Sequence, residues 1–129
     1  MCGMAKGFDL VAGSLVVALK ESWAELSGLN LIAVLPFERH DFSNEPWRTL
    51  HQIVLGAASE VVTLASKYHP QAYHDRNRYM VDHSTQLICY YDGKKGGTHF
   101  TVKYAEERGL TIINVAKSGS RGLSNITHL

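Results

Sequence analysis

The residues with the clearest capacity for chemistry form a short segment, Asp92-Gly93-Lys94-Lys95-Gly96-Gly97-Thr98. It follows a run of β-forming residues and precedes a helical pattern, so it joins a strand to a helix. Glycines let a ligand approach the backbone closely, and the first amides of a helix, at the positive end of its dipole, attract an anion. Thr98 can cap the helix or donate its hydroxyl to a phosphate. The segment predicts an anion site; a glycine turn with solvated lysines is the alternative, and the spacing is not that of a Walker loop.

Two further segments have residue types suited to a ligand. Arg76 and Asn77 lie early in a second helical pattern, where Arg can grip a phosphate or carboxylate with two hydrogen bonds and Asn can pair with a base or ribose edge. A polar helix face with local ion pairs is the alternative. In Gly3–Asp9 glycines again lead into a helix, and Asp9 near its first turn either serves a ligand or only complements the helix dipole.

Several kinds of chemistry are not indicated. His69, His74, Asp75 and His83 resemble metal ligands in type, but they lack the spacing of a zinc site, so we predict no metal and no cofactor. Cys89 lies inside an apolar run and is expected to be a buried thiol rather than a nucleophile.

Charge and cysteine content narrow the possible partners and the compartment. The net charge is +1, and no basic run marks a nucleic-acid surface. Two cysteines are too few for a secreted disulfide scaffold, and no signal peptide or apolar stretch of about 20 residues is present. We therefore expect a soluble, cytoplasmic protein without nucleic acid or a membrane as its partner.

The elements that must position these residues alternate between helix and strand. Helices are predicted over 8–26 (stopped by Gly28), 46–58, 72–83 and 98–108, and strands over 31–37, 61–65, 87–91 and 111–115. Because the apolar strand runs show no polar alternation, we expect a Rossmann-like, doubly wound, mostly parallel sheet covered on both faces, in a three-layer α/β/α arrangement. Ligands of such sheets bind at the carboxyl ends of the strands. One domain over 1–116 and a flexible tail over 117–129 are predicted.

Four motifs in this order resemble one protein family. They are Gly3-Met4-Ala5-Lys6-Gly7-Phe8-Asp9-Leu10, Leu31-Ile32-Ala33-Val34-Leu35-Pro36-Phe37, Tyr73-His74-Asp75-Arg76-Asn77-Arg78-Tyr79-Met80-Val81, and Leu87-Ile88-Cys89-Tyr90-Tyr91-Asp92-Gly93 with Gly96-Gly97-Thr98. Together they closely resemble the YpsA-like branch of the bacterial SLOG superfamily, which also includes the DNA-processing protein DprA and the lonely-guy phosphoribohydrolases. The resemblance covers nearly the whole chain.

The resemblance implies a Rossmann-like fold that binds nucleotide-related ligands along the glycine loop, with Arg76 as a ligand-contacting arginine. The residues expected at the ligand are Gly3, Met4, Lys6, Asp9, Pro36, Tyr73, Arg76, Asn77, Asp92, Gly96, Gly97, Thr98 and Thr101. Relatives of the YpsA-like kind have a strand and a Thr-Gly turn before the Gly-Met-Ala stretch, so we expect this chain to be shortened at its N-terminus. A bared sheet edge favours pairing with another molecule, and a homo-oligomer is therefore predicted.

Thr101 decides between the functions that the resemblance implies. Lonely-guy hydrolases have a glutamate at this position, and a threonine cannot act as an acid or base near neutral pH. The first expectation is thus regulatory binding of an ADP-ribose-like or NAD-like ligand without catalysis, and no catalytic residue is assigned. The alternatives are an N-glycosidase acting on nucleoside monophosphates and a DprA-like binder of single-stranded DNA, which the near-neutral charge disfavours.

Overall fold

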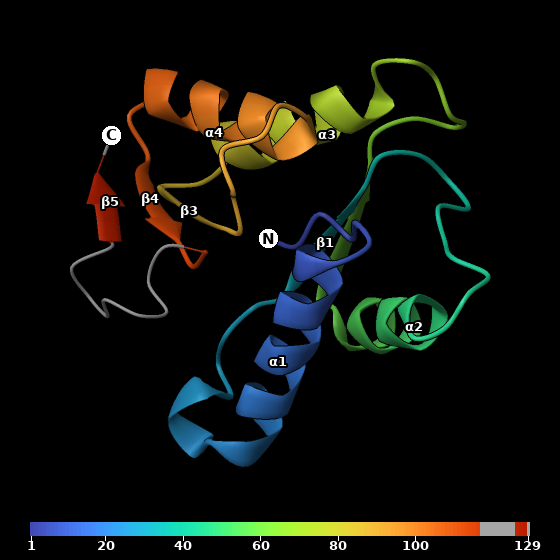
Figure 1. The fold of residues 1–129 in the computed structure, drawn as a ribbon. Helices are drawn as coiled ribbons and strands as arrows, with labels where there is room; N and C mark the ends of the chain where they lie inside the picture. Colours follow the sequence, from blue (N-terminus) through green and yellow to red (C-terminus); the bar gives the residue numbers. More distant parts are fainter. Residues whose placement is uncertain (117–125, 129) are drawn as a thin grey trace. The chain divides into compact units, whose positions relative to one another are not determined.

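A computed structural model describes residues 1–116 and 126–128 of the chain (Figure 1). The described residues form, in order, α1 (Phe8–Ser22), the 3₁₀ helix η1 (Ala24–Leu26), β1 (Ile32–Leu35), α2 (Trp47–Ala57), β2 (Glu60–Thr63), α3 (Ala72–Asp82), β3 (Gln86–Cys89), α4 (Gly97–Glu107), β4 (Thr111–Asn114) and β5 (Ile126–His128). This is a mixed α/β, Rossmann-like fold of the α/β/α class with parallel strands, as the sequence predicts. The chain divides into two compact units, Met1–Ala72 (unit 1) and Tyr73–Leu129 (unit 2).

The main difference in helix boundaries concerns the first helix. It ends at Ser22 instead of continuing to Leu26, because Trp23 takes an extended conformation with φ −124° and ψ 116°. The 3₁₀ helix η1 follows directly after Trp23. The apolar spacing continues through this short turn, which is why the sequence pattern does not reveal the break.

Unit 1 is built around the parallel pair β1 and β2, which runs in register from Ile32 opposite Glu60 to Leu35 opposite Thr63. Cys2 extends the pairing at the other edge of β1, where its N–H donates to the Ile32 carbonyl and its own carbonyl accepts from the Val34 N–H, both at 2.8 Å. Helices α1 and α2 contact each other and share one core with β1. That core consists of Cys2, Met4, Leu10, Val17, Leu31, Ala33, Leu35 and Val54.

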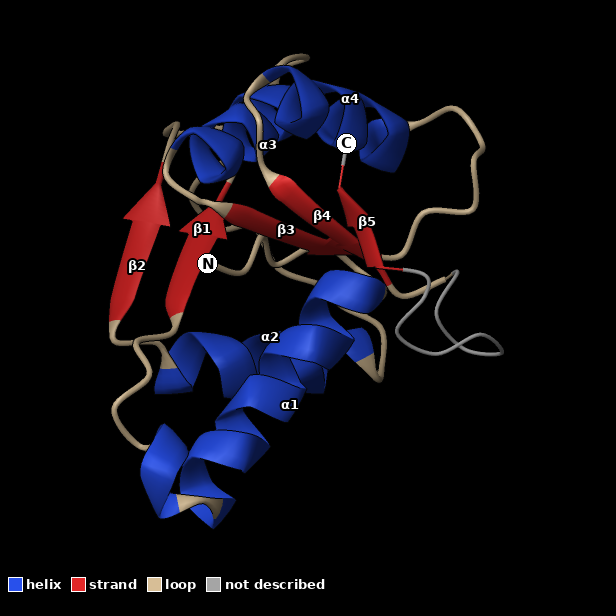
Figure 2. Cartoon of the chain, turned by 90° about the vertical axis from the view of Figure 1, so that its left-hand side faces the viewer, coloured by secondary structure: helices blue, strands red, loops and turns tan. Residues whose placement is uncertain are grey.

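Unit 2 contains a sheet of order β3-β4-β5, in which β3 and β4 are parallel and β5 is antiparallel to β4. Its core comprises Val81 of α3, Cys89 of β3, Val102 and Ala105 of α4, Leu110 and Ile112. Figure 2 shows α3 and α4 together along β3 and β4. The predicted flexible tail falls largely on residues 117–125 and 129, which lie outside the described residues; β5 was not predicted from the sequence.

Two strands are more exposed than their apolar sequences suggest. Val61 of β2 is 45% exposed and Ile88 of β3 is 57% exposed, so the prediction that apolar runs 61–65 and 87–91 are buried on both faces is wrong at these side chains. The described strands also hydrogen-bond in two separate sets rather than in one continuous sheet. An apolar run indicates a strand, but which of its faces another element covers depends on tertiary packing.

Candidate ligand-binding segments

The glycine segment lies at the start of α4, as predicted, and its backbone explains two of its glycines. Gly93 and Gly96 have φ values of 90° and 155°, in the region that favours glycine. Gly96 is the N-cap of α4, and no side chain among the described residues caps this helix. Thr98 is the second residue of the helix, so the alternative that it serves as the N-cap is wrong. The N-terminal amides of α4 therefore have no side-chain acceptor in residues 1–116 and 126–128.

Gly97 differs from these glycines because neither conformation nor crowding requires it. Its φ is not positive, and a Cβ built on it meets no atom within 4 Å. The same open space surrounds Gly93 and Gly96. A ligand can thus reach the backbone of the segment without first displacing a side chain.

Charged and hydroxyl side chains around the segment bond locally. The Asp92 carboxylate accepts from the Lys94 N–H at 3.0 Å, and its second oxygen lies 4.0 Å from the Lys94 ammonium, which is highly exposed. The Thr101 hydroxyl donates to the Gly97 carbonyl at 3.0 Å. Asp92 thus stabilises the turn, and Thr101 is bonded to its own helix.

Tyr73, Arg76 and Asn77 form a contact group on α3. The Arg76 Nε–H donates to the Asn77 side-chain oxygen at 3.0 Å, and the guanidinium lies 5.5 Å from the centre of the Tyr73 ring. Arg76 is only 5% exposed. A guanidinium ordered by these contacts loses little conformational freedom when it binds an anion.

Helices α3 and α4 meet through another face of α3. The His74 ring lies 4.1 Å from the Phe100 ring, and the Arg78 guanidinium lies 5.2 Å from the same ring. Two residues along a helix correspond to about 200° of rotation, so Arg76 points away from the face that carries His74 and Arg78. Unit 2 therefore places α3 beside α4 through the side of α3 that carries His74 and Arg78.

Four of the five predicted residues of unit 1 lie at or just before the start of α1, and the fifth follows β1. Gly3 and Met4 are buried, and Met4, with φ 62°, belongs to the core. The Asp9 carboxylate accepts from the Ala5 N–H at 3.4 Å, and Lys6 is exposed. Pro36 is fully buried just after β1. Their role at a ligand stays a prediction.

Sequence reasoning did not consider three polar residues next to the glycine segment. Asn114 at the end of β4 is buried and bonds to the backbone of Tyr91, and the Tyr91 hydroxyl contacts the His99 ring nitrogen. Asn114 follows the segment by 16 residues or more, and a polar residue at a strand end carries no specific signal.

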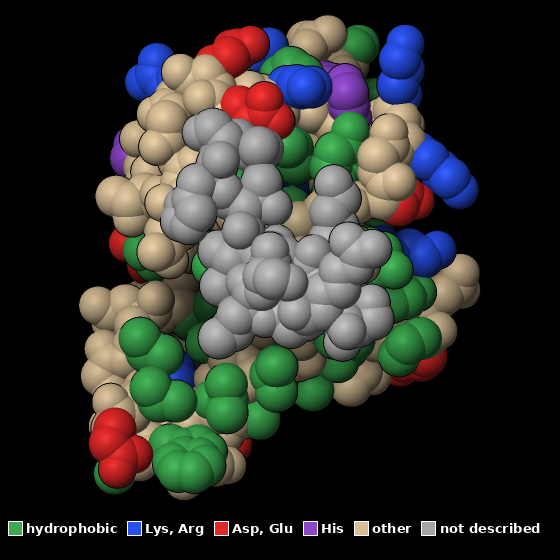
Figure 3. All heavy atoms as spheres, turned by 60° about the vertical axis from the view of Figure 1, so that its left-hand side comes forward, with side chains coloured by type: hydrophobic (Ala, Val, Ile, Leu, Met, Phe, Trp, Pro, Cys, Tyr) green, Lys and Arg blue, Asp and Glu red, His purple; other side chains and the backbone are tan. Residues whose placement is uncertain are grey.

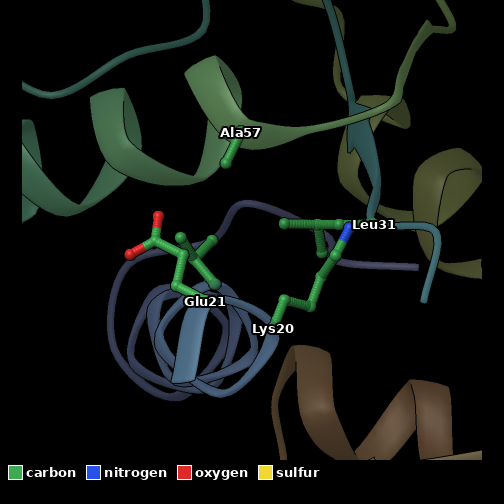
Figure 4. Close-up of a pocket in the computed structure, with 5 residues that line it drawn as sticks. Lys20, Glu21, Leu31 and Ala57 are labelled. Carbon is green, nitrogen blue, oxygen red and sulfur yellow. The ribbon is translucent and has the colours of Figure 1, made fainter. Parts of the chain in front are cut away.

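Other sites for chemistry are not evident in the part of the chain that is described. Residues 1–116 and 126–128 contain no group of three or more His, Cys, Asp or Glu side chains arranged to hold a metal ion, and no helix there is long and apolar enough to cross a membrane. Burial raises the pKa of the Cys89 thiol, which disfavours the reactive thiolate. A cavity of about 200 Å³ is lined by Val17, Lys20, Glu21, Leu31 and Ala57, none of which is a predicted ligand residue. Figure 4 shows its lining residues from α1 and α2.

Comparisons with known proteins agree with the motif resemblance. The family model named YpsA, described as the YspA SLOG family, matches residues 1–114. An uncharacterised SPbeta prophage-derived protein of Bacillus subtilis strain 168, YoqJ, is 28% identical over 124 residues, covering 84% of this chain and 69% of that protein.

Proposed function

This chain belongs to the YspA SLOG family, and on that premise we propose that it binds a phosphate-bearing, nucleotide-related ligand of the ADP-ribose or NAD type in a regulatory role. In this proposal the protein holds the ligand without cleaving it. We also propose that it acts in the cytoplasm.

The uncapped start of α4 is the observation that carries the proposal. The amides of its first turn point out of the helix N-terminus with the positive end of the dipole behind them. The open space around Gly93, Gly96 and Gly97 leaves room for phosphate oxygens to approach these amides. Lys94 and Lys95 are both exposed and add positive charge near the same turn.

The Arg76 group supplies the second element of recognition. Its guanidinium is ordered by Asn77 and Tyr73, which suits bidentate bonding to a phosphate or carboxylate. The Tyr73 side chain is 42% exposed, so its ring can also stack on a base. An anion, a ribose and a base are the three parts of a nucleotide that these residue types recognise.

The contacts of Thr101 favour binding over hydrolysis. Its hydroxyl donates to the Gly97 carbonyl, and a hydroxyl is neither an acid nor a base near neutral pH. The Asp92 carboxylate is engaged with the Lys94 N–H and lies beside a lysine ammonium. Neither group is arranged as the general acid that glycosidic cleavage needs.

Titration calorimetry of the protein against ADP-ribose, NAD, nucleoside monophosphates and inorganic phosphate tests the proposal. We expect binding by the wild type and roughly 10-fold weaker binding by Gly97→Ala, because the added methyl meets the phosphate. The same change stabilises a helix whose glycine φ suits alanine, by about 0.4–1 kcal/mol. Weaker binding by a more stable protein cannot be attributed to unfolding.

Gly56→Ala is the matched control for this substitution. Gly56 also lies in a helix with open space around it, so alanine there should stabilise the fold and leave binding unchanged. Absence of binding to every ligand of the panel by the wild type, or equal affinity in Gly97→Ala and wild type, contradicts the proposal.

The two alternative functions give different outcomes in simple assays. Release of free base from nucleoside monophosphates, abolished by Arg76→Ala, would establish an N-glycosidase instead. Retardation of single-stranded DNA at moderate salt, sensitive to Arg76 or Lys94, would establish a DNA binder. We expect neither, since the net charge is +1 and Thr101 replaces the hydrolytic glutamate.

A further inference from the structure

Asn114 is one of the few buried polar residues of the described chain, and it is 4% exposed. It is the last residue of β4 and lies opposite Cys89, the last residue of β3. Its side-chain oxygen accepts from the N–H groups of Tyr91 at 3.0 Å and of Ala116 at 3.1 Å. Its side-chain N–H donates to the Tyr91 carbonyl at 2.9 Å.

These bonds satisfy both backbone groups of Tyr91 at the point where the β3–β4 ladder ends. The last backbone bond of that ladder runs from the Val115 N–H to the Cys89 carbonyl at 2.9 Å. Beyond this bond, the side chain of Asn114 makes the hydrogen bonds to Tyr91 that the backbone of a neighbouring strand would otherwise make. The chain is therefore held in place up to Tyr91, the residue directly before the glycine segment 92–98.

Tyr91 also holds the other end of the same segment. Its hydroxyl is hydrogen-bonded to Nδ1 of His99, the third residue of α4. Both side chains are half-buried. Tyr91, anchored by Asn114, thus connects the exit of β3 to the first turn of α4.

Among the described residues, the segment between these anchors has only local contacts of its own. The Lys94 N–H donates to Asp92, and the Phe100 N–H donates to the Gly96 carbonyl. Residues 92–98 are all exposed, and the Cβ positions of the glycines face open space. Without anchors, such a segment with three glycines would sample many conformations.

We propose that Asn114 is the positioning residue of the anion-binding segment, acting through Tyr91 and His99. This inference rests on the proposed function, since segment 92–98 is the anion site of that proposal. Asn114 touches no ligand in this account. It fixes the direction of the N–H groups of Gly97 and Thr98. Phosphate binding then loses no free energy in ordering the segment.

Asn114→Leu tests this role because leucine has the same branched heavy-atom skeleton and forms none of the three hydrogen bonds. Two readouts are measured on the full chain: ¹⁵N backbone order parameters of residues 92–98, and the dissociation constant for ADP-ribose. In the wild type we expect order parameters of about 0.85, falling below about 0.6 in the variant. Affinity for ADP-ribose should fall roughly 10-fold.

A gentler substitution keeps the test decisive if Asn114→Leu does not fold. Tyr91→Phe removes the contact with His99 alone and should loosen the segment from the α4 side. The control is Ile112→Val, which lowers stability within the same strand and core but leaves segment 92–98 ordered.

The two proposals fail in different ways. If the wild type binds no ligand of the panel, the proposed function fails, and the order parameters still test the role of Asn114. Order parameters in Asn114→Leu that equal those of the wild type overturn the positioning role. The same holds if Ile112→Val loosens the segment as much as Asn114→Leu, because Asn114 would then only stabilise the core.

Discussion

Arg76 is a charged residue that is buried and already ordered. The bond from its Nε to Asn77 and its position over the Tyr73 ring hold the guanidinium in one orientation. Burying a charge is costly unless hydrogen bonds compensate for it. A buried arginine at the start of a helix is therefore a strong candidate for anion recognition.

Replacing Arg76 by lysine should weaken ligand binding more than it weakens the fold. An ammonium keeps the charge but loses the planar fork that forms two parallel hydrogen bonds, so we expect roughly 10-fold lower affinity in calorimetry. Arg78→Lys is the control on the same helix, because Arg78 forms an exposed pair with Asp75 at 3.5 Å. Equal losses in both variants would contradict a specific role for Arg76.

His51 of α2 makes stability depend on pH. It is 3% exposed, its Nε2 has no hydrogen-bond partner in the described part of the chain, and its ring lies 5.6 Å from that of His40. Burial lowers the pKa of His51 below its ordinary value of 6.5, partly offset by the charge of Asp41 and a hydrogen bond to the His40 backbone. Below pH 6.5 the unfolded chain therefore takes up this proton before the folded chain does.

The free energy of unfolding should consequently fall as the pH is lowered through and below 6.5, and the contribution of His51 should be fully present above it. Urea denaturation at about pH 7.5 and about pH 5.5 measures this change. His51→Gln cannot titrate and should lose less stability between the two conditions. A loss as large in His51→Gln as in the wild type would show that other groups cause it.

At the scale of elements, the packing of α1 on unit 1 depends on one glycine. Gly13 lies in the middle of α1, and a Cβ there would approach Cys2 Sγ and a Val54 methyl, each at 3.0 Å. Both neighbours belong to the buried core, so they have little room to move. Gly13 thus permits the close approach of α1 to α2 and to the first residues of the chain.

Gly13→Ala should destabilise the protein although alanine favours helices. Overpacking costs about 1–3 kcal/mol, more than the gain of at most about 1 kcal/mol from helix propensity. Gly56→Ala, in the open part of α2, should instead stabilise it. Chemical denaturation of both variants gives the comparison; a Gly13→Ala protein as stable as Gly56→Ala would show that the core adjusts.

At the scale of the whole molecule, α1 exposes a stripe of large apolar side chains. Val11, Leu15 and Leu19 recur every four residues, so they lie along one side of the helix, and Trp23 follows directly after its end. Each of the four is at least 36% exposed. Figure 3 shows exposed hydrophobic side chains, in green, on the face of the molecule that it draws. Exposed apolar patches of this kind favour association.

We therefore expect the chain to self-associate, in line with the predicted homo-oligomer. Sedimentation equilibrium should give a mass above that of one chain, and Leu15→Glu should return it to the monomer by placing a charge in the stripe. Gln52→Glu on the exposed side of α2 adds the same charge outside the stripe and should not change the mass. A wild type that stays monomeric at high concentration rules out this expectation.

The sequence by itself determined the family, the alternation of helix and strand, and the position of a glycine-rich segment at the start of α4. These features depend on local patterns: helical and strand spacing, turn residues and the order of motifs. The sequence predicts a strand before segment 92–98 and a helix from Thr98, one residue after the observed start of α4 at Gly97.

Only the tertiary structure decided which faces are covered and which side chains act together. Val61 and Ile88 are as apolar as any core residue, but their exposure depends on elements far away in the sequence. The bonds of Asn114 to Tyr91 join residues 23 positions apart, and the burial of Arg76 likewise cannot be deduced from its neighbours along the chain. Such contacts arise when separate elements pack, so local sequence patterns do not contain them.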